Sequence, residues 1–413
     1  MVSHFRPLAE FNRLFTPLVG VALIVLGAGG IAGAQTPPPA NTTPAGAAAV
    51  TPPPPDAPET PPAADPKKEE TKSDVAAFFR GTELGGLVDA RYTYFSTKPE
   101  GDAQFRNFDT RHNQFGLSMA QLWLAKAPTS DSRGGFKVKL SAGPATTIVQ
   151  SLEPGASNVL QNIEEGFISY LAPLGKGLQI DAGKFVTQHG AEVIEAKDNW
   201  NYSRSLLFAL AIPYYHSGVR ATYSPTGKIT LMGAIVNGWN NVVENNSAKT
   251  FGAQITYKPT AALSLVQNYM AGPEQANDNH DWRHLFDSTA TLTVNPKLSL
   301  MANYDYGTDT VAGAKVSWQG VAGYAKFQAS PRVAFSPRLE WYDDKSGFTT
   351  GTPETLKDIT TTLELKATDA FLWRIEYRSD FSDAAVFKMP SGALKKTQSS
   401  IGFGILYSFS TKG

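Results

Sequence analysis

The chain has 413 residues, 37 basic and 37 acidic residues, and no cysteine. The absence of cysteine excludes a disulfide framework, and it also excludes the lipidated cysteine that anchors bacterial lipoproteins. Aromatic residues make up 11% of the chain and charged residues only 18%, with 36 glycines, a composition that favours a β-rich protein.

The first 34 residues are predicted to be a signal peptide. Arg6 and Arg13 form its basic start, an apolar run extends from Leu18 to Ile31, and Ala32-Gly33-Ala34 supplies a small-residue cleavage site. The run is shorter than the roughly 20 residues that a membrane-spanning helix needs. We therefore expect residues 1–34 to be removed on export.

Proline, alanine and threonine dominate the next segment, residues 35–80, which includes the run Pro52-Pro53-Pro54-Pro55. Such a composition cannot bury a core, so we expect a disordered linker in the periplasm. Two roles remain open for it, an inert tether and a segment that reaches toward the cell wall or a partner.

Residues 81–413 alternate apolar and polar side chains with a period of two. In one stretch Phe371, Trp373, Ile375 and Tyr377 share a face, and Leu372, Arg374, Glu376 and Arg378 share the other. Only a strand separates residues in this way, because a helix would spread them around its circumference. The same pattern occurs within residues 88–94, 136–142, 298–306, 333–341 and 359–367.

Short turns and long polar loops alternate between these stretches. Turns marked by proline or glycine occur at 172–175, 224–227, 258–260, 295–297 and 330–332. Longer segments occupy 97–111, 146–161, 188–212, 237–248, 272–282, 345–355 and 383–395. This rhythm predicts an all-β fold, a transmembrane antiparallel up-and-down β-barrel of about 16 strands, with 14 to 18 possible and both termini on the periplasmic side. A soluble β-sandwich also alternates, but it does not require this regular exchange of short and long connections.

The last predicted strand places Ile401, Phe403, Ile405, Tyr407 and Phe409 on one face. It resembles the aromatic-ended closing strand that bacterial barrel-assembly machinery recognises. Here four further residues, Ser410-Thr411-Lys412-Gly413, follow the aromatic residue. We expect the barrel-assembly machinery to be a partner during biogenesis.

The stretch from Asp181 to Tyr223 carries an ordered set of short motifs. They are Ala182-Gly183-Lys184-Phe185, Gly190-Ala191-Glu192-Val193, Asn199-Trp200-Asn201-Tyr202-Ser203-Arg204-Ser205 and Ile212-Pro213-Tyr214-Tyr215-His216-Ser217-Gly218-Val219-Arg220. In their order and spacing they resemble the β-barrel porins of the OmpL-like type, with similarity from about Leu84 to the end. The resemblance implies a pore-forming outer-membrane protein for small hydrophilic solutes.

The segment 188–212 is longer than a simple strand connection requires. Two arrangements fit its polar composition: it folds into the mouth and narrows the channel, or it forms an outer cap over the rim.

The sequence offers little evidence for a catalytic or metal-binding site. The sequence has no HExxH spacing, no GxSxG elbow and no phosphate-binding glycine loop. His280 and His284, beside Asp278 and Asp281, suit a metal only on a helix, and a solvated polar loop fits them better. We expect no cofactor, no metal and no nucleic-acid partner.

By parity, a set of charged side chains points away from the lipid-facing aromatic residues and into the barrel. Buried charges require water or a partner, which favours a wet lumen lined by charges of both signs. Two arrangements remain open, cross-strand ion pairs that stiffen the wall and a transverse field across a water channel. No acidic residue separates Lys137 from Lys139, which favours anion preference. The inward set is Asp89, Arg91, Lys137, Lys139, Arg220, Arg338, Glu340, Glu364, Arg374, Glu376, Arg378 and Asp380.

The sequence thus predicts a passive outer-membrane porin for small hydrophilic solutes or ions, surrounded by outer-membrane lipid, with a homotrimer as a candidate assembly. Two alternatives differ in class, an outer-membrane barrel hydrolase and a plugged structural or adhesive barrel. The candidate pore-lining or constriction residues are Lys137, Lys139, Glu192, Arg204, Arg220, Arg338, Glu340, Arg374, Glu376 and Arg378.

Overall fold

The computed structural model describes residues 81–151, 153 and 161–412. The predicted signal peptide and the whole predicted linker lie outside these residues. Among the described residues, no helix is both long enough and apolar enough to cross a membrane. In chain order the elements are β1 (Glu83–Phe95), β2 (Gln114–Lys126), β3 (Gly134–Ala142), α3 (Pro144–Val149), β4 (Ile163–Ala172), β5 (Leu178–Val186), η1 (Ala196–Asp198), η2 (Leu207–Ala211), β6 (Tyr215–Tyr223), β7 (Ile229–Val236), β8 (Thr250–Tyr257), β9 (Leu263–Pro273), β10 (Trp282–Asn295), β11 (Leu298–Val311), β12 (Ala314–Ser330), β13 (Val333–Asp344), β14 (Glu354–Lys366), β15 (Phe371–Ser382), β16 (Phe387–Lys388), β17 (Leu394–Lys395) and β18 (Thr397–Ser410).

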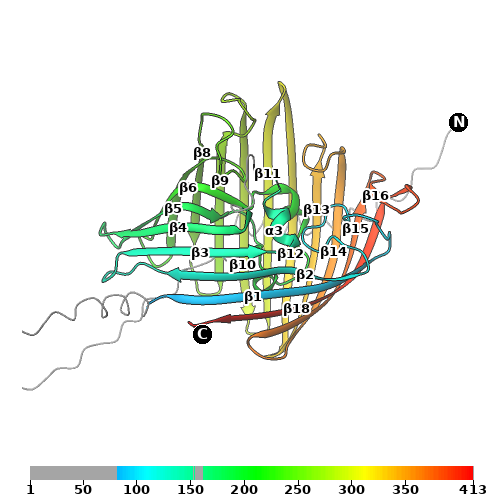
Figure 1. The fold of residues 1–413 in the computed structure, drawn as a ribbon, viewed down its shortest axis with the longest axis horizontal. Helices are drawn as coiled ribbons and strands as arrows, with labels where there is room; N and C mark the ends of the chain where they lie inside the picture. Colours follow the sequence, from blue (N-terminus) through cyan, green and yellow to red (C-terminus); the bar gives the residue numbers. More distant parts are fainter. Residues whose placement is uncertain (1–80, 152, 154–160, 413) are drawn as a thin grey trace, which may run out of the picture. The chain divides into compact units, whose positions relative to one another are not determined.

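Sixteen strands close into one antiparallel barrel, which confirms the predicted fold class and strand number. Neighbours in sequence are neighbours in the wall, and β1 pairs with β18 to close the ring. Figure 1 shows these two strands, blue and dark red, running side by side. β16 and β17 form a separate two-stranded sheet within the connection between β15 and β18.

The connections follow the predicted alternation with one exception. All five predicted short turns join strands at one rim, where β1 also begins and β18 ends. At the other rim the connections are long, except that Ala312 and Gly313 alone join β11 to β12. Both residues have positive φ, 50° and 80°, as a two-residue hairpin turn requires. β11 and β12 contain 14 and 17 residues, so this hairpin extends both strands where the neighbouring strands end in loops.

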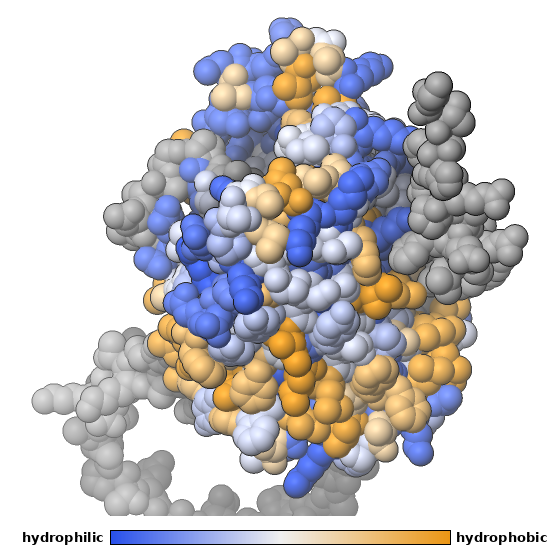
Figure 2. All heavy atoms as spheres, turned by 90° about the vertical axis from the view of Figure 1, so that its right-hand side faces the viewer, coloured by the Kyte–Doolittle hydropathy of each residue, from blue (hydrophilic) through white to orange (hydrophobic). Residues whose placement is uncertain are grey.

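The two faces of the wall differ as the alternation predicts. Outward residues such as Val138, Trp373 and Tyr377 are exposed, whereas their inward neighbours Lys139, Arg374 and Arg378 are buried. Figure 2 shows apolar side chains gathered over the lower wall of the face it displays, with hydrophilic ones above them. The outward apolar wall suits contact with lipid.

Candidate pore constriction

The connection between β5 and β6, residues 187–214, lies inside the barrel. It begins and ends on one side of the ring, and it hydrogen-bonds to β13, β14 and β15 on the opposite side. Asn201 donates through Nδ2 to the Ser336 carbonyl at 2.9 Å and to Thr362 Oγ1 at 2.8 Å. The segment therefore crosses the lumen. Of the two arrangements left open by the sequence, the inserted one is confirmed.

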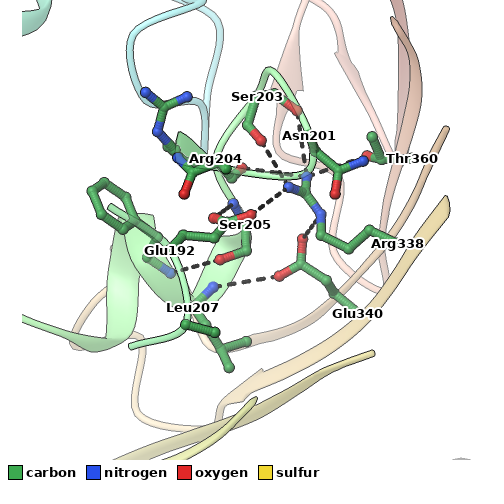
Figure 3. Close-up of polar contacts among 12 residues, drawn as sticks. Glu192, Asn201, Ser203, Arg204, Ser205, Leu207, Arg338, Glu340 and Thr360 are labelled. Carbon is green, nitrogen blue, oxygen red and sulfur yellow. Dashed lines mark hydrogen bonds and ion pairs between the residues drawn. The ribbon is translucent and has the colours of Figure 1, made fainter. Parts of the chain in front are cut away.

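Arg338 on β13 is the centre of the contact between this segment and the wall. Its side chain is fully buried, and Nη1 donates to the Ser203 carbonyl at 2.7 Å and to Glu192 Oε1 at 3.1 Å. Its Nε lies 2.8 Å from Glu340 Oε1 on the same strand. Figure 3 shows the guanidinium between Ser203 and Glu192 of the segment and Glu340 of the wall. One wall cation thus binds both a backbone carbonyl and a carboxylate of the segment.

Two wall carboxylates satisfy backbone amides of the segment. Glu340 accepts from the amide of Leu206 at 2.7 Å, and Glu376 on β15 accepts from the amides of Tyr202 and Ser203 at 2.6 and 2.9 Å. Residues 199–206 have no strand or helix partner for these amides, and an unpaired buried amide is costly. Acidic side chains on the wall therefore replace the missing secondary structure.

Two further arginines of β15 bind carbonyls of the segment. Arg374 donates to the carbonyls of Asn199 at 2.5 Å and Asn201 at 3.1 Å, and Arg378 donates to the Arg204 carbonyl at 2.6 Å. Both are buried, and their charges are balanced within the wall. Arg374 lies 2.6 Å from Glu364, and Arg378 lies 2.7 and 2.6 Å from Asp358 and Asp380.

Arg204 does not extend into open space. Its guanidinium folds back on the segment and donates to the carbonyls of Val193, Tyr202 and Ile194. It also lies 5.0 Å above the ring of Phe108. Burial lowers the pKa of Arg204, and the nearby Glu192 carboxylate opposes that effect. Arg204 thus stabilises the inserted conformation from within.

On the β3 side a second contact holds the beginning of the segment. Lys139 Nζ lies 2.9 Å from Glu164 and 3.4 Å from Glu165, and it also contacts Glu195 of the segment. Gln121 on β2 donates to Glu164 at 2.6 Å and to Glu195 at 3.1 Å. The segment is therefore held on two sides of the ring.

An apolar patch holds the end of the segment. Leu207, Phe208 and Ala211 of η2 are buried, and the Trp318 indole on β12 donates to the Ala211 carbonyl at 3.2 Å. Gly320 leaves room for Leu207, because a Cβ there would lie 2.8 Å from Leu207 Cδ1. This part of the interior is packed as a protein core rather than lined with water.

A family model described as putative beta-barrel porin-2, OmpL-like, matches residues 81–409. The chain belongs to this family of porins. No curated protein sequence matches it. Among solved structures it is similar to the anion-selective porin from Comamonas acidovorans, with 12% identity, a TM-score of 0.55 and coverage of 79% of this chain and 99% of that one. It is also similar to the outer membrane channel DcaP of Acinetobacter baumannii, with 12% identity, a TM-score of 0.53 and coverage of 79% and 97%. A trimer form of OmpT, an outer membrane protein of Vibrio cholerae, is 10% identical, with a TM-score of 0.54 and coverage of 79% and 99%.

At these identities the solved structures establish the fold alone, which is a porin barrel. The family and the fold together place this porin in the bacterial outer membrane. The predicted resemblance to the OmpL-like porins is confirmed over nearly the whole barrel.

The ten predicted site residues of this porin fall into two groups. Eight meet at the inserted segment, and the other two, Lys137 and Arg220, lie on β3 and β6. The expectation that Arg374, Glu376 and Arg378 face water is wrong for this conformation, because the segment covers them. Solute contact by the ten residues stays a prediction. The group at the segment consists of Lys139, Glu192, Arg204, Arg338, Glu340, Arg374, Glu376 and Arg378.

Sequence reasoning missed several residues of this contact. Asp358 lies between two outward residues, so the same parity that placed Arg338 inward applies to it. Glu195, Asn201 and Tyr202 gave no such signal, because a loop has no periodicity that assigns its side chains to a face. His284 lies in β10 and His280 precedes it, so the two histidines are not one helical turn apart.

Proposed function

We propose that this porin allows passive diffusion of small hydrophilic solutes or ions across the outer membrane. The observation that carries the proposal is the inserted segment 187–214, which narrows a closed barrel whose interior side chains are charged. A barrel that served only as a membrane anchor would not need a polar segment bound across its lumen. In this proposal the solutes pass beside the segment, and the segment sets the width of their path.

The extensive contact of the segment with the wall also favours a second candidate, a barrel that the segment plugs. Arg338 and Arg378 have fully buried side chains, so this part of the lumen excludes water. The two candidates predict different currents through a lipid bilayer. A constricted porin conducts as purified, whereas a plugged barrel conducts only after the segment is removed or displaced.

Planar bilayer recordings separate these candidates. We expect stepwise conductance from the purified chain and a larger unitary conductance after deletion of residues 194–205. Deletion of residues 276–280, in the connection between β9 and β10, is the matched control and should leave conductance unchanged. Silence of the intact chain with conductance of the deletion variant would identify a plugged barrel. Silence of both folded proteins would overturn the pore.

The same proposal includes removal of the signal peptide, periplasmic termini, insertion by the barrel-assembly machinery and assembly as a homotrimer. A trimer form of one structurally similar protein supports the last point. Cross-linking in outer-membrane fractions tests it, since a trimer gives a ladder that ends at three copies.

A further inference from the structure

Three ion pairs on the inner wall share one feature, an exposed cation and a covered anion. The Lys137 side chain is 28% exposed and its partner Glu165 is 3% exposed, at an Nζ to Oε2 distance of 2.5 Å. Arg220 and Asp181 are 22% and 3% exposed, at 2.9 Å. Lys326 and Glu364 are 23% and 3% exposed, at 3.3 Å. In each pair the basic group is the one that water and a passing solute reach.

The difference in side-chain length explains this arrangement. The carboxylates lie close to the wall, and the longer lysine and arginine side chains extend past them toward the lumen. The pairs belong to strands spread around the ring, with their cations on β3, β6 and β12. Although each pair is neutral in sum, a solute in the lumen is nearer to the positive member. Charge at short range acts more strongly than charge farther away and closer to the wall.

The rim with the short turns adds positive charge of its own. Each of its seven short turns has a basic residue in it or directly beside it. In the turn between β2 and β3 this residue is Arg133. Three acidic residues, Glu83, Asp131 and Asp369, lie at the same rim. The remaining six turns carry Lys176, Lys228, Lys258, Lys297, Arg332 and Lys366.

Two of these lysines line a hollow in the rim. A cavity of about 390 Å³ lies between the turn from β6 to β7 and the turn from β8 to β9, and both Lys228 and Lys258 are among its lining residues. The excess of basic residues thus surrounds the mouth and also borders a space that a small ion can enter. A ring of basic groups at a pore mouth raises the local concentration of anions.

We infer that the solutes of this pore are anions, attracted by the basic rim at the short turns and passed along the exposed cations Lys137, Arg220 and Lys326. The inference rests on the proposed pore and names its solute class. It does not depend on the residues that bind the inserted segment, which are covered. An anion that enters at this rim meets the basic turn residues first and the exposed wall cations next.

The test is the reversal potential of the purified chain in a planar bilayer with a potassium chloride gradient. We expect chloride to permeate several-fold better than potassium. The triple variant K228E/K258E/R332E should shift the permeability ratio toward potassium, as should K137Q/K326Q. The matched control K345E/K388E/K395E changes three exposed lysines at the opposite rim and should keep the chloride preference.

The outcomes separate the inference from the function on which it rests. A conducting pore that is unselective or prefers potassium would overturn the inference and leave the pore intact. Chloride preference that survives both sets of substitutions would overturn its assignment to these residues. Absence of conductance in every variant, with folded barrels confirmed by heat-modifiable migration, would overturn both.

Discussion

Replacement of Arg338 by methionine should release the inserted segment from the wall. Methionine keeps much of the side-chain volume and removes the guanidinium. Glu192, Glu340 and Asp358 then lose a shared cation, which lies 3.1, 2.8 and 3.3 Å from them, and the Ser203 carbonyl loses its donor. Removing one member of a buried ion pair costs about 3–5 kcal/mol, because the partner charge stays buried.

That magnitude predicts a measurable opening of the segment. Because about 1.4 kcal/mol corresponds to a tenfold change in an equilibrium, a loss of about 3 kcal/mol raises the undocked population by roughly 100-fold. Hydrogen exchange by mass spectrometry on protein in lipid nanodiscs reports this population. We expect faster exchange at Ser205 and Leu206, whose amides bind Glu192 and Glu340, with no change in the strands.

The matched control is Lys345→Met. Its side chain is 79% exposed and lies 3.6 Å from Asp343, so its ion pair contributes little. We expect wild-type exchange throughout. If exchange at Ser205 and Leu206 in Arg338→Met stayed within a factor of three of wild type, the ion network would not be what holds the segment in place.

Three further substitutions test other contacts of the structure. Gly404→Val places a Cβ atom 2.4 Å from the Tyr202 ring, and this overpacking costs about 1–3 kcal/mol. The segment should be displaced, and single-channel currents should become noisier. The control Gly402→Ala, whose Cβ has its nearest neighbouring atom at 3.7 Å, should leave the currents unchanged. Lys139→Met leaves Glu195 and Glu164 without their cation, whereas Glu165 keeps Lys137, and faster hydrogen exchange at 194–198 should follow. Burial raises the pKa of Glu274 to about 7, against the attraction of Arg283. Because the pKa is raised, the protonated Glu274 side chain contributes its full stabilisation below pH 4.5, and this stabilisation is lost as the pH rises through about 7. Residues 238–246 should therefore exchange hydrogen faster at pH 8 than at pH 5, after correction for intrinsic exchange rates. Glu274→Gln should remove that difference.

The wall of this porin could be predicted from sequence because each strand residue has only two possible directions. Once Trp373 and Tyr377 were assigned to lipid, Arg374, Glu376 and Arg378 had to point inward, and they do. Proline and glycine marked the short turns, and the alternation of short and long connections predicted the number of strands. Only the tight connection at Ala312 and Gly313 departs from the predicted rhythm, since a two-residue hairpin leaves no loop composition to detect.

The inserted segment could not be predicted in the same way. Parity shows that Arg338 points inward, but it does not show whether water or another part of the chain meets it. The contacts of Arg338 with Glu192 and Ser203 join residues more than 130 positions apart. No local pattern encodes such contacts, and the resemblance to a porin family supplied the expectation of a functional loop without its position.

The inserted segment and the proposed anion path depend on the same division of the interior charges. Residues 199–206 of the segment have few regular backbone hydrogen bonds, so wall arginines bind their carbonyls and wall carboxylates bind their amides. Those charges are then no longer available to a solute. On the inner wall, Lys137, Arg220 and Lys326 remain accessible, because the segment does not cover them. Arg338→Met, which releases the segment, should therefore widen the pore and also weaken its chloride preference, because it removes one wall cation and returns Glu340 and Asp358 to the lumen.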